Sequence, residues 1–298
     1  MLVGLNAGFG RTLAADWPFI SSAGFTVVRQ VFAVEIDDAT LHQLTAEFVG
    51  RPIRLLALLG GGENRTARGG RIEPHQFATL GARVAKSVAD VGLRDALIEV
   101  GNEPDIGHPD YANRPRDFAM AVAQTHAAVR QAGHTGVIIS GGISNLSRER
   151  LDYLERVVPH LSPDIVVGFH RYPHGPGPEQ PHPGFANRDA EWVRLKQITG
   201  GRQVTCTEFG HHTAPRRYGR LGLVRRRRRV SDQAVADHIV YDLAYFRERG
   251  CLASAIYQLN DGPTDRPIDR YGIRRADGTP KPAVAAIAGF VRDLKTKG

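Results

Sequence analysis

The feature that most constrains the fold is a regular alternation of two patterns along the chain. Short runs rich in Val, Ile and Leu, typical of parallel strands covered on both faces, occur at residues 2–6, 25–31, 53–59, 96–101, 137–141, 164–169, 203–208 and 253–259. Longer amphipathic runs that predict helices lie near 12–23, 38–49, 73–91, 115–132, 147–160, 189–199, 231–249 and 281–296. Eight such units in 298 residues predict an α/β fold, a single (β/α)8 TIM barrel that spans residues 1–298 as one domain.

A doubly wound open sheet is the alternative arrangement of the same units. An open nucleotide-binding sheet has a glycine-rich phosphate-binding turn after its first strand and an acidic residue at the end of the next strand. The first turn here, Asn6-Ala-Gly-Phe-Gly-Arg11, lacks the third glycine of that pattern. The barrel is therefore the favoured prediction.

Composition and charge restrict the possible partners. No apolar run approaches the roughly 20 residues that span a bilayer, and the first residues lack the pattern of a secretory signal. We therefore expect no membrane partner and a cytoplasmic protein as the chain is written, or a secreted one if the chain is a processed form. The net charge of +8 comes largely from Arg225–Arg229, since the chain without these five residues would carry +3.

Polar side chains gather where the predicted strands end, which is the edge at which barrel enzymes place their chemistry. Glu103 follows the fourth strand and Glu208 ends the seventh. Cleavage of a glycosidic bond needs two such carboxyl groups, one protonated to assist the leaving oxygen and one ionised. The alternative interpretation is that each glutamate only caps its strand or pairs with an arginine.

The segments around these glutamates resemble glycoside hydrolase clan A, the superfamily of cellulase-type (β/α)8 retaining glycosidases. Asn102-Glu103-Pro104 and Thr207-Glu208-Phe209-Gly210 are similar to its two hallmark motifs. Further likenesses are Arg29 at the end of strand two, His170-Arg-Tyr172 at the end of strand six, and the stretches Tyr257–Asp261, Tyr271–Ile273 and Asp277–Pro282. The resemblance touches five of the eight units in the correct order.

The resemblance implies a retaining β-glycosidase with Glu103 as the acid/base and Glu208 as the nucleophile. It further implies that Arg29 keeps Glu208 ionised, that Tyr172 donates a hydrogen bond to it, and that Asn102 holds the sugar 2-hydroxyl. His170 would position the sugar or the acid/base, and His211 would line the substrate cleft. Tyr257 stands where the clan usually has a tryptophan under the sugar, so the platform would be smaller.

Other features support different expectations. Glu99 points into the barrel four residues before Glu103, and we expect it to pair with Arg29 or Arg54 because a buried acid needs a partner. The first strand offers only Asn6 and lacks the His-x-His pair that barrel metallohydrolases usually carry there, so no metal and no cofactor are expected. The arginine run is either a solvated loop or a clamp for an acidic exopolysaccharide. Nucleic acid is not expected, since few aromatic residues lie among the arginines.

The predicted function is hydrolysis of β-glycosidic bonds in an oligo- or polysaccharide. Two alternatives stay open, a non-catalytic carbohydrate-binding barrel and a barrel hydrolase of another class. An aldolase would need a strand-end lysine, whereas Lys86, Lys196 and Lys281 fall on predicted helices or at the start of one.

Overall fold

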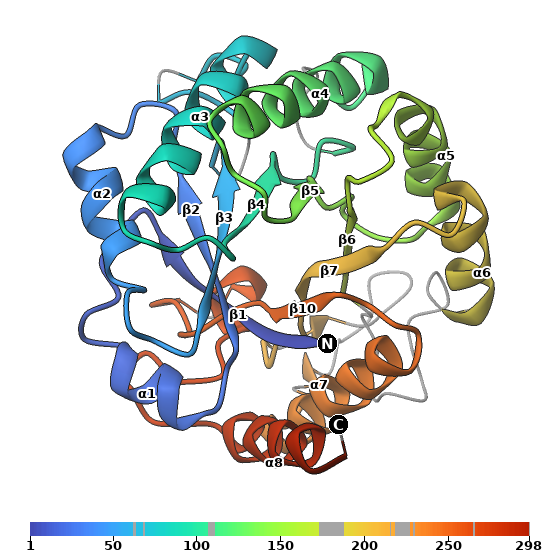
Figure 1. Cartoon of the computed structure of the whole chain (residues 1–298). Coiled ribbons are helices and arrows are strands. Elements are labelled where there is room, and N and C mark those ends of the chain that lie inside the picture. The colour runs from blue at the N-terminus through green and yellow to red at the C-terminus, as the bar shows by residue number, and fades with distance from the viewer. Residues whose placement is uncertain are drawn as a thin grey trace.

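The computed structural model describes residues 1–61, 64–67, 69–106, 111–172, 188–214, 216–217, 227–228, 230–264 and 266–297. Its main sheet contains eight parallel strands in the order β5-β4-β3-β2-β1-β10-β7-β6. Their bounds are β1 (Leu2–Phe9), β2 (Val27–Phe32), β3 (Arg54–Leu59), β4 (Leu97–Val100), β5 (Ile138–Ser140), β6 (Val167–Arg171), β7 (Val204–Phe209) and β10 (Ala253–Ile256). The two edge strands meet through a bridge between Ile139 and Val166, so the sheet forms a nearly closed barrel (Figure 1).

The helices surround the barrel on the outside (Figure 1). They are α1 (Trp17–Ser22), α2 (Asp38–Ala46), α3 (Pro74–Asp90), α4 (Pro115–Gln131), α5 (Arg148–Val157), α6 (Arg188–Thr199), α7 (Asp232–Glu248) and α8 (Pro282–Lys297), with the 3-10 helices η1 (Val158–His160) and η3 (Pro267–Arg270). The predicted (β/α)8 barrel is confirmed. The first helix begins at Trp17 rather than near residue 12, because Pro18 fits the first turn of a helix.

The interior of the barrel is layered because successive strand residues point to opposite faces of a sheet. A small apolar cluster fills one end, made of Val27, Leu56, Leu97, Ile139, Val166 and Ala253. Two residues further along their strands, on the same face, follow Arg29 on β2 and Glu99 on β4. The barrel interior thus changes from apolar to charged toward the carboxyl ends of the strands.

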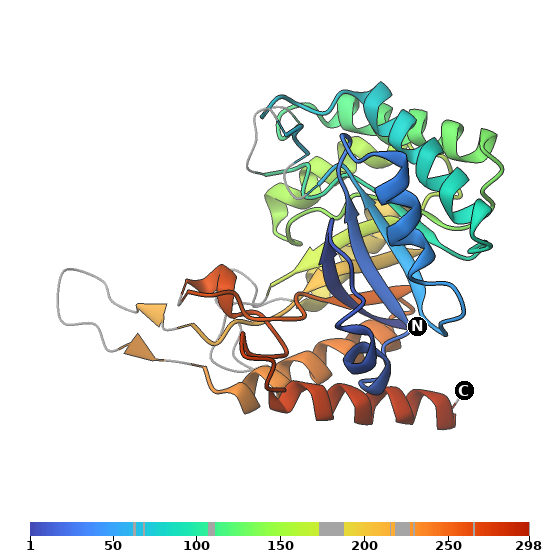
Figure 2. The same cartoon turned by 90° about the vertical axis from the view of Figure 1, so that its left-hand side faces the viewer.

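Two short strands that the periodicity did not predict follow β7. β8 (Arg216–Arg217) and β9 (Arg227–Arg228) pair antiparallel, with Arg216 opposite Arg228. They extend away from the barrel in Figure 2, on the side where β7 ends. Part of the predicted arginine clamp, at residues 225, 226 and 229, lies outside the described residues.

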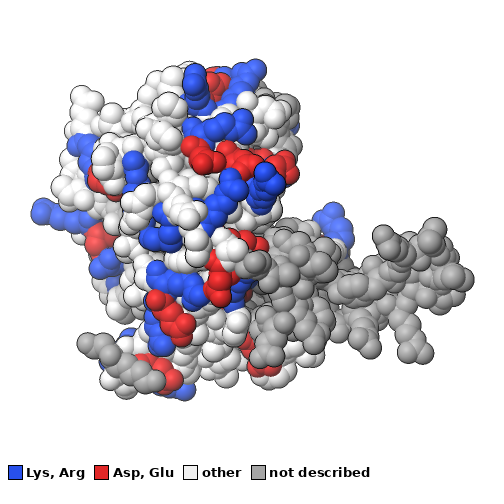
Figure 3. All heavy atoms as spheres, turned by 90° about the vertical axis from the view of Figure 1, so that its right-hand side faces the viewer, with Lys and Arg blue, Asp and Glu red and all other residues white. Residues whose placement is uncertain are grey.

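Figure 3 shows how charged side chains are distributed over one face of the molecule. On this face, Lys and Arg side chains are interspersed with Asp and Glu side chains. The part of the face that the structure describes therefore presents mixed charges rather than one basic patch. Among the described residues, no helix combines the length and the hydropathy needed to cross a membrane.

Candidate active site

The backbone at the end of β4 has an unusual conformation that sets the direction of Glu103. Gly101 and Glu103 both have a left-handed backbone, with φ of 75° and 43°. A non-glycine residue in this region costs free energy and needs support from its surroundings. The support comes from Asn64, whose side chain accepts a hydrogen bond from the Asn102 amide at 2.7 Å and donates one to the Asn102 carbonyl. The Glu103 amide in turn donates to the Gly142 carbonyl at 3.0 Å.

Glu208 is the penultimate residue of β7, inside the barrel mouth, and is held at both carboxylate oxygens. Arg29 donates to Oε1 from Nη1, and the Tyr172 hydroxyl donates to Oε2 at 2.5 Å. Burial raises the pKa of Glu208, but the charges of His170 and Arg29 and the hydrogen bonds from Tyr172 and Arg29 outweigh it. The net pKa of Glu208 is therefore lowered, and the carboxyl is ionised at neutral pH.

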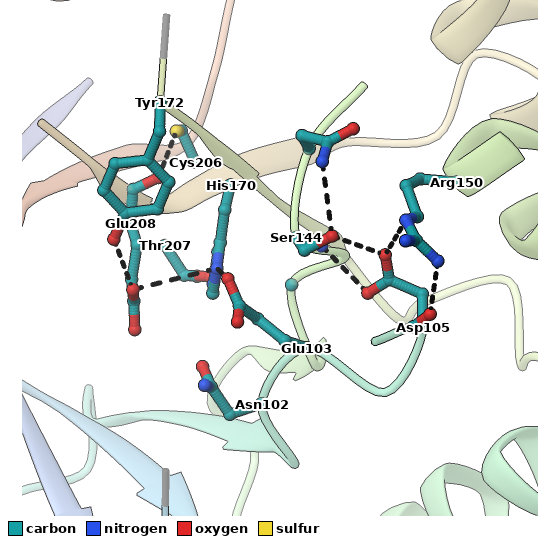
Figure 4. Close-up of polar contacts among 12 residues, drawn as sticks. Asn102, Glu103, Asp105, Ser144, Arg150, His170, Tyr172, Cys206, Thr207 and Glu208 are labelled. Atoms are coloured by element: carbon teal, nitrogen blue, oxygen red, sulfur yellow. Dashed lines mark hydrogen bonds and ion pairs between the residues drawn. The ribbon is translucent and has the colours of Figure 1, made fainter. Parts of the chain in front are cut away.

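The two glutamates face each other with His170 between them (Figure 4). A carboxylate oxygen of Glu103, one of Glu208 and a ring nitrogen of His170 all lie within 4.8 Å of one another. Nδ1 of His170 is 2.9 Å from Glu103 Oε1 and 3.8 Å from Glu208 Oε2. The sequence prediction that β4 and β7 bring two acids to one gap agrees with this geometry.

His170 is completely buried. Its ring fits because Gly142 has no side chain. A Cβ at residue 142 would lie 2.4 Å from His170 Nε2, so a side chain there would displace the imidazole. Burial lowers the pKa of His170, but the charges of Glu208 and Glu103 and the hydrogen bond to Glu103 outweigh it and raise the net pKa. With a proton on Nδ1 the ring donates to Glu103, and in its doubly protonated form it adds positive charge beside Glu208.

Arg29 connects the nucleophile position to the layer below it. Its guanidinium donates to Glu99 Oε2 at 2.6 Å, to Asn6 Oδ1 at 2.9 Å and to Asn102 Oδ1 at 2.9 Å, in addition to Glu208. Glu99 is fully buried, and its predicted pairing with Arg29 is confirmed, whereas Arg54 pairs with Asp95 at 2.9 Å. Burial lowers the pKa of Arg29, but Glu99 and Glu208 raise it further, so the guanidinium is permanently charged.

A second polar cluster, which the sequence did not reveal, fixes the chain just after Glu103. Asp105 is 1% exposed and accepts hydrogen bonds from the amide and hydroxyl of Ser144, at 2.9 and 2.7 Å (Figure 4). Arg150 donates to the Asp105 carbonyl at 2.6 Å. Burial raises the pKa of Asp105 while the bonds from Ser144 lower it, and burial prevails. The segment that carries Glu103 is thereby tied to the loop after β5 as well as to Asn64.

The remaining predicted site residues lie at different places. Tyr257 follows β10 directly and packs edge-on against Tyr172, with ring centroids 6.2 Å apart. Tyr271 completes this aromatic group at 5.4 Å from Tyr172. His211 is 3% exposed and stacks on His238 of α7, with ring centroids 4.2 Å apart, so it presents little surface to a ligand.

The same three groups could in principle ligate a metal ion, since Glu103, His170 and Glu208 offer three ligand atoms. Both oxygens of Glu208 already accept hydrogen bonds from Arg29 and Tyr172. The buried guanidinium would also repel a second cation a few ångströms away. This donor set therefore suits proton transfer and attack by a carboxylate better than cation binding.

Comparison with known proteins places the barrel among glycoside hydrolase folds. No family model matches the sequence, and no curated protein matches it. The structure is similar to a family 39 glycoside hydrolase from Bacteroides cellulosilyticus WH2, with a TM-score of 0.72 and 19% identity over 98% of this chain and 64% of that one. It is also similar to the exo-β-1,4-mannosidase of Opitutaceae bacterium strain TAV5, with a TM-score of 0.70 and 17% identity over 100% of this chain and 60% of that one.

An endo-β-1,4-glucanase from Xanthomonas axonopodis pv. citri has a TM-score of 0.65 and 12% identity, and the match covers 98% of this chain and 99% of that one. The chain thus spans less than two thirds of the first two relatives and nearly all of the third. At these identities the likeness shows that the chain has the barrel fold of glycoside hydrolases.

Proposed function

We propose that this protein is a retaining glycoside hydrolase that cleaves β-glycosidic bonds of an oligo- or polysaccharide. The observation that carries the proposal is the separation of the two acids, since oxygens of Glu103 and Glu208 lie within 4.8 Å of each other. Retaining enzymes hold their carboxyl groups about 5–5.5 Å apart, whereas inverting enzymes need about 6.5–9.5 Å to admit a water. This upper limit for one oxygen of each acid is compatible with the retaining spacing and lies below the inverting range.

The first step uses the ionised state of Glu208 that Arg29 and Tyr172 support. A Glu208 oxygen attacks the anomeric carbon, and the bond from that carbon to the glycosidic oxygen breaks. Glu103 gives its proton to the departing oxygen, so the leaving sugar departs as a neutral alcohol and Glu103 becomes a carboxylate. Asn102, held by Arg29 at its Oδ1, would contact the sugar 2-hydroxyl.

The second step reverses the roles of the same two residues. The Glu103 carboxylate takes a proton from water, and the water oxygen attacks the anomeric carbon. The bond between that carbon and Glu208 breaks, which restores the carboxylate of Glu208 and the acid form of Glu103. His170, which contacts both acids, would keep Glu103 in place while its charge changes.

The decisive experiment is trapping of the glycosyl-enzyme. A panel of β-glycosides with fluorine at C2 and a good leaving group should label wild-type protein, and peptide mass spectrometry should place the label on Glu208. Glu208→Gln should abolish labelling and turnover of soluble β-glycans. Glu248→Gln, which changes a glutamate side chain that is 63% exposed at the end of α7, is the matched control and should leave both unchanged.

Two results would contradict the proposal. Turnover retained by Glu208→Gln would remove Glu208 as the nucleophile. Binding of β-glycans without hydrolysis or labelling of the wild type would instead support a non-catalytic carbohydrate-binding barrel.

A further inference from the structure

A cavity beside the catalytic pair is not used by the two steps above. Its volume is about 360 Å³, and it is lined by residues that include Asn6, Arg11, Tyr257, Gln258, Asn260 and Asp269. This volume falls within the range of about 300–1,000 Å³ that is common for small-molecule sites. The cavity is formed by the ends of β1 and β10 and by the segment that follows β10.

Two of the lining residues connect this cavity to Glu208. Asn6 accepts a hydrogen bond from the same Arg29 nitrogen, Nη1, that donates to Glu208. Tyr257 packs against Tyr172, which donates to the other oxygen of Glu208. One residue, Arg29 or Tyr172, therefore separates each of these lining residues from Glu208. The cavity lies on the side of β10, the strand that pairs with β7.

The lining has the mixed character that a sugar ring needs. Asn260 and Gln258 provide amide groups for hydroxyls, and Tyr257 adds an aromatic side chain to the lining. Ile268, which also lines the cavity, is 52% exposed, so an apolar side chain lies open beside the polar ones. A pyranose has an apolar C–H face and a polar rim, which match these two kinds of surface.

Of the residues that the structure describes, two charged ones line the cavity, Arg11 and Asp269, and further ion pairs surround it. Arg11 and Arg274 share one carboxylate, Asp16, and Arg274 also donates to Asn260 at 2.6 Å. Lys281 and Arg270 share Asp261, at 2.8 and 3.5 Å, while Arg266 faces Asp269 at 3.5 Å. These ion pairs around the cavity contain five cationic side chains and three carboxylates, and of these eight groups Arg11 and Asp269 line the cavity itself.

Arg11 is the cation best placed to meet a ligand. It lines the cavity, and its side chain is 52% exposed. Its Nη2 contacts Asp16 at 3.2 Å, and because a guanidinium carries five N–H donors, others remain for a ligand. Arginine binds carboxylates with two parallel hydrogen bonds, which gives direction as well as charge.

We propose that this cavity is a subsite for a sugar that carries a carboxylate, such as a uronic acid, with Arg11 as its specificity-determining residue. This inference rests on the proposed function for its meaning in catalysis, since the sugar bound here would be a neighbour of the one attacked by Glu208. The substrate class would then be an acidic β-linked glycan.

The test compares matched pairs of ligands and does not depend on turnover. Methyl β-glycosides of glucuronic, galacturonic and mannuronic acid are titrated against the full chain by ligand-detected NMR at low ionic strength, beside those of glucose, galactose and mannose. At least one acid should bind about tenfold or more tightly than its neutral partner, a difference of about 1.4 kcal/mol, because a hydrogen bond to a charged group is stronger than one between neutral groups. Arg11→Gln should remove this preference, and Arg94→Gln, an exposed arginine before β4, should keep it.

The outcomes separate the two proposals. A preference that is absent from all three pairs in the wild type, or that survives in Arg11→Gln, overturns the subsite even if Glu208 is labelled. A preference that is lost only in Arg11→Gln supports the subsite even if no hydrolysis occurs, in which case the proposed hydrolase activity alone fails.

Discussion

Replacement of Arg29 by methionine tests the electrostatic core of the site without any knowledge of the substrate. Arg29 is 2% exposed and makes ion pairs with Glu99 and Glu208, which are 0% and 8% exposed. Arg29→Met keeps much of the side-chain volume and removes the charge, which leaves two buried carboxylates without their cation. Loss of one partner of a buried ion pair costs about 3–5 kcal/mol, and with two carboxylates affected we expect the upper part of this range.

The assay is urea and thermal unfolding, with Arg94→Met as the exposed control. For a domain of this size each kcal/mol corresponds to roughly 2–4 °C in Tm, so Arg29→Met should melt roughly 10–20 °C below the wild type. Glu99→Gln should destabilise the wild type but stabilise the Arg29→Met background, because there it removes a buried charge that has lost its partner. In a double-mutant cycle of Arg29→Met and Glu99→Gln we expect an interaction free energy of about 1–3 kcal/mol.

The pH dependence of this difference has a definite sign. In the wild type the folded-state pKa of Glu208 is lowered, so its contribution to stability is present above the unfolded pKa of about 4.3 and is lost as the pH falls. In Arg29→Met, Glu208 loses the charge and the hydrogen bond of Arg29 that lower its pKa while burial still raises it, so the penalty of its buried charge becomes smaller at acid pH. The gap in stability between the two proteins should therefore narrow between pH 7 and about pH 4. A gap below about 1 kcal/mol at pH 7, or one that widens in acid, would refute the reasoning.

Three further substitutions probe the other contacts. Glu103→Ala should lower kcat/KM about 10²–10⁴-fold on β-glycosides with poor leaving groups and much less on dinitrophenyl glycosides; equal losses on both would argue against an acid role. Tyr172→Phe removes the hydrogen bond that lowers the pKa of Glu208, so the acid limb of the pH profile of kcat/KM should move to higher pH, and an unmoved limb would contradict this. Asp105→Ala leaves the amide and hydroxyl of Ser144 without their acceptor and should cost about 1–3 kcal/mol in urea unfolding; Asp105→Asn should recover part of this loss, and a neutral Asp105→Ala would show that the cluster is dispensable.

The sequence predicted the barrel and the meeting of Glu103 and Glu208 for one physical reason. Short apolar strands and amphipathic helices are local patterns, and the carboxyl ends of parallel strands meet at one edge, so strand-end residues converge whatever their separation in sequence. The pairing of Glu99 with Arg29 was predictable on the same basis, because both side chains point into the barrel and a buried acid needs a cation.

The supports of Glu103 could not be predicted in this way. Asn64 lies in a loop after β3, and the sequence around it gives no sign that its side-chain amide binds both the N–H and the carbonyl of Asn102. The left-handed backbone of Glu103 depends on that contact and on Gly142, and both come from loops rather than from periodic segments. The pairing of β8 with β9 is likewise invisible to periodicity, because two-residue strands have no period.

The contacts of Arg29 and Tyr172 with Glu208 have a consequence for protein engineering. Glu208→Gly would leave the Arg29 guanidinium and the Tyr172 hydroxyl directed at a space the size of a small carboxylate. Formate has the charge and shape to fill that space, and a ligand bound only by the folded state raises its stability. The variant should therefore melt at a higher temperature in formate than in an equal concentration of a bulky anion. The position would then be an engineered binding site that distinguishes anions by their size.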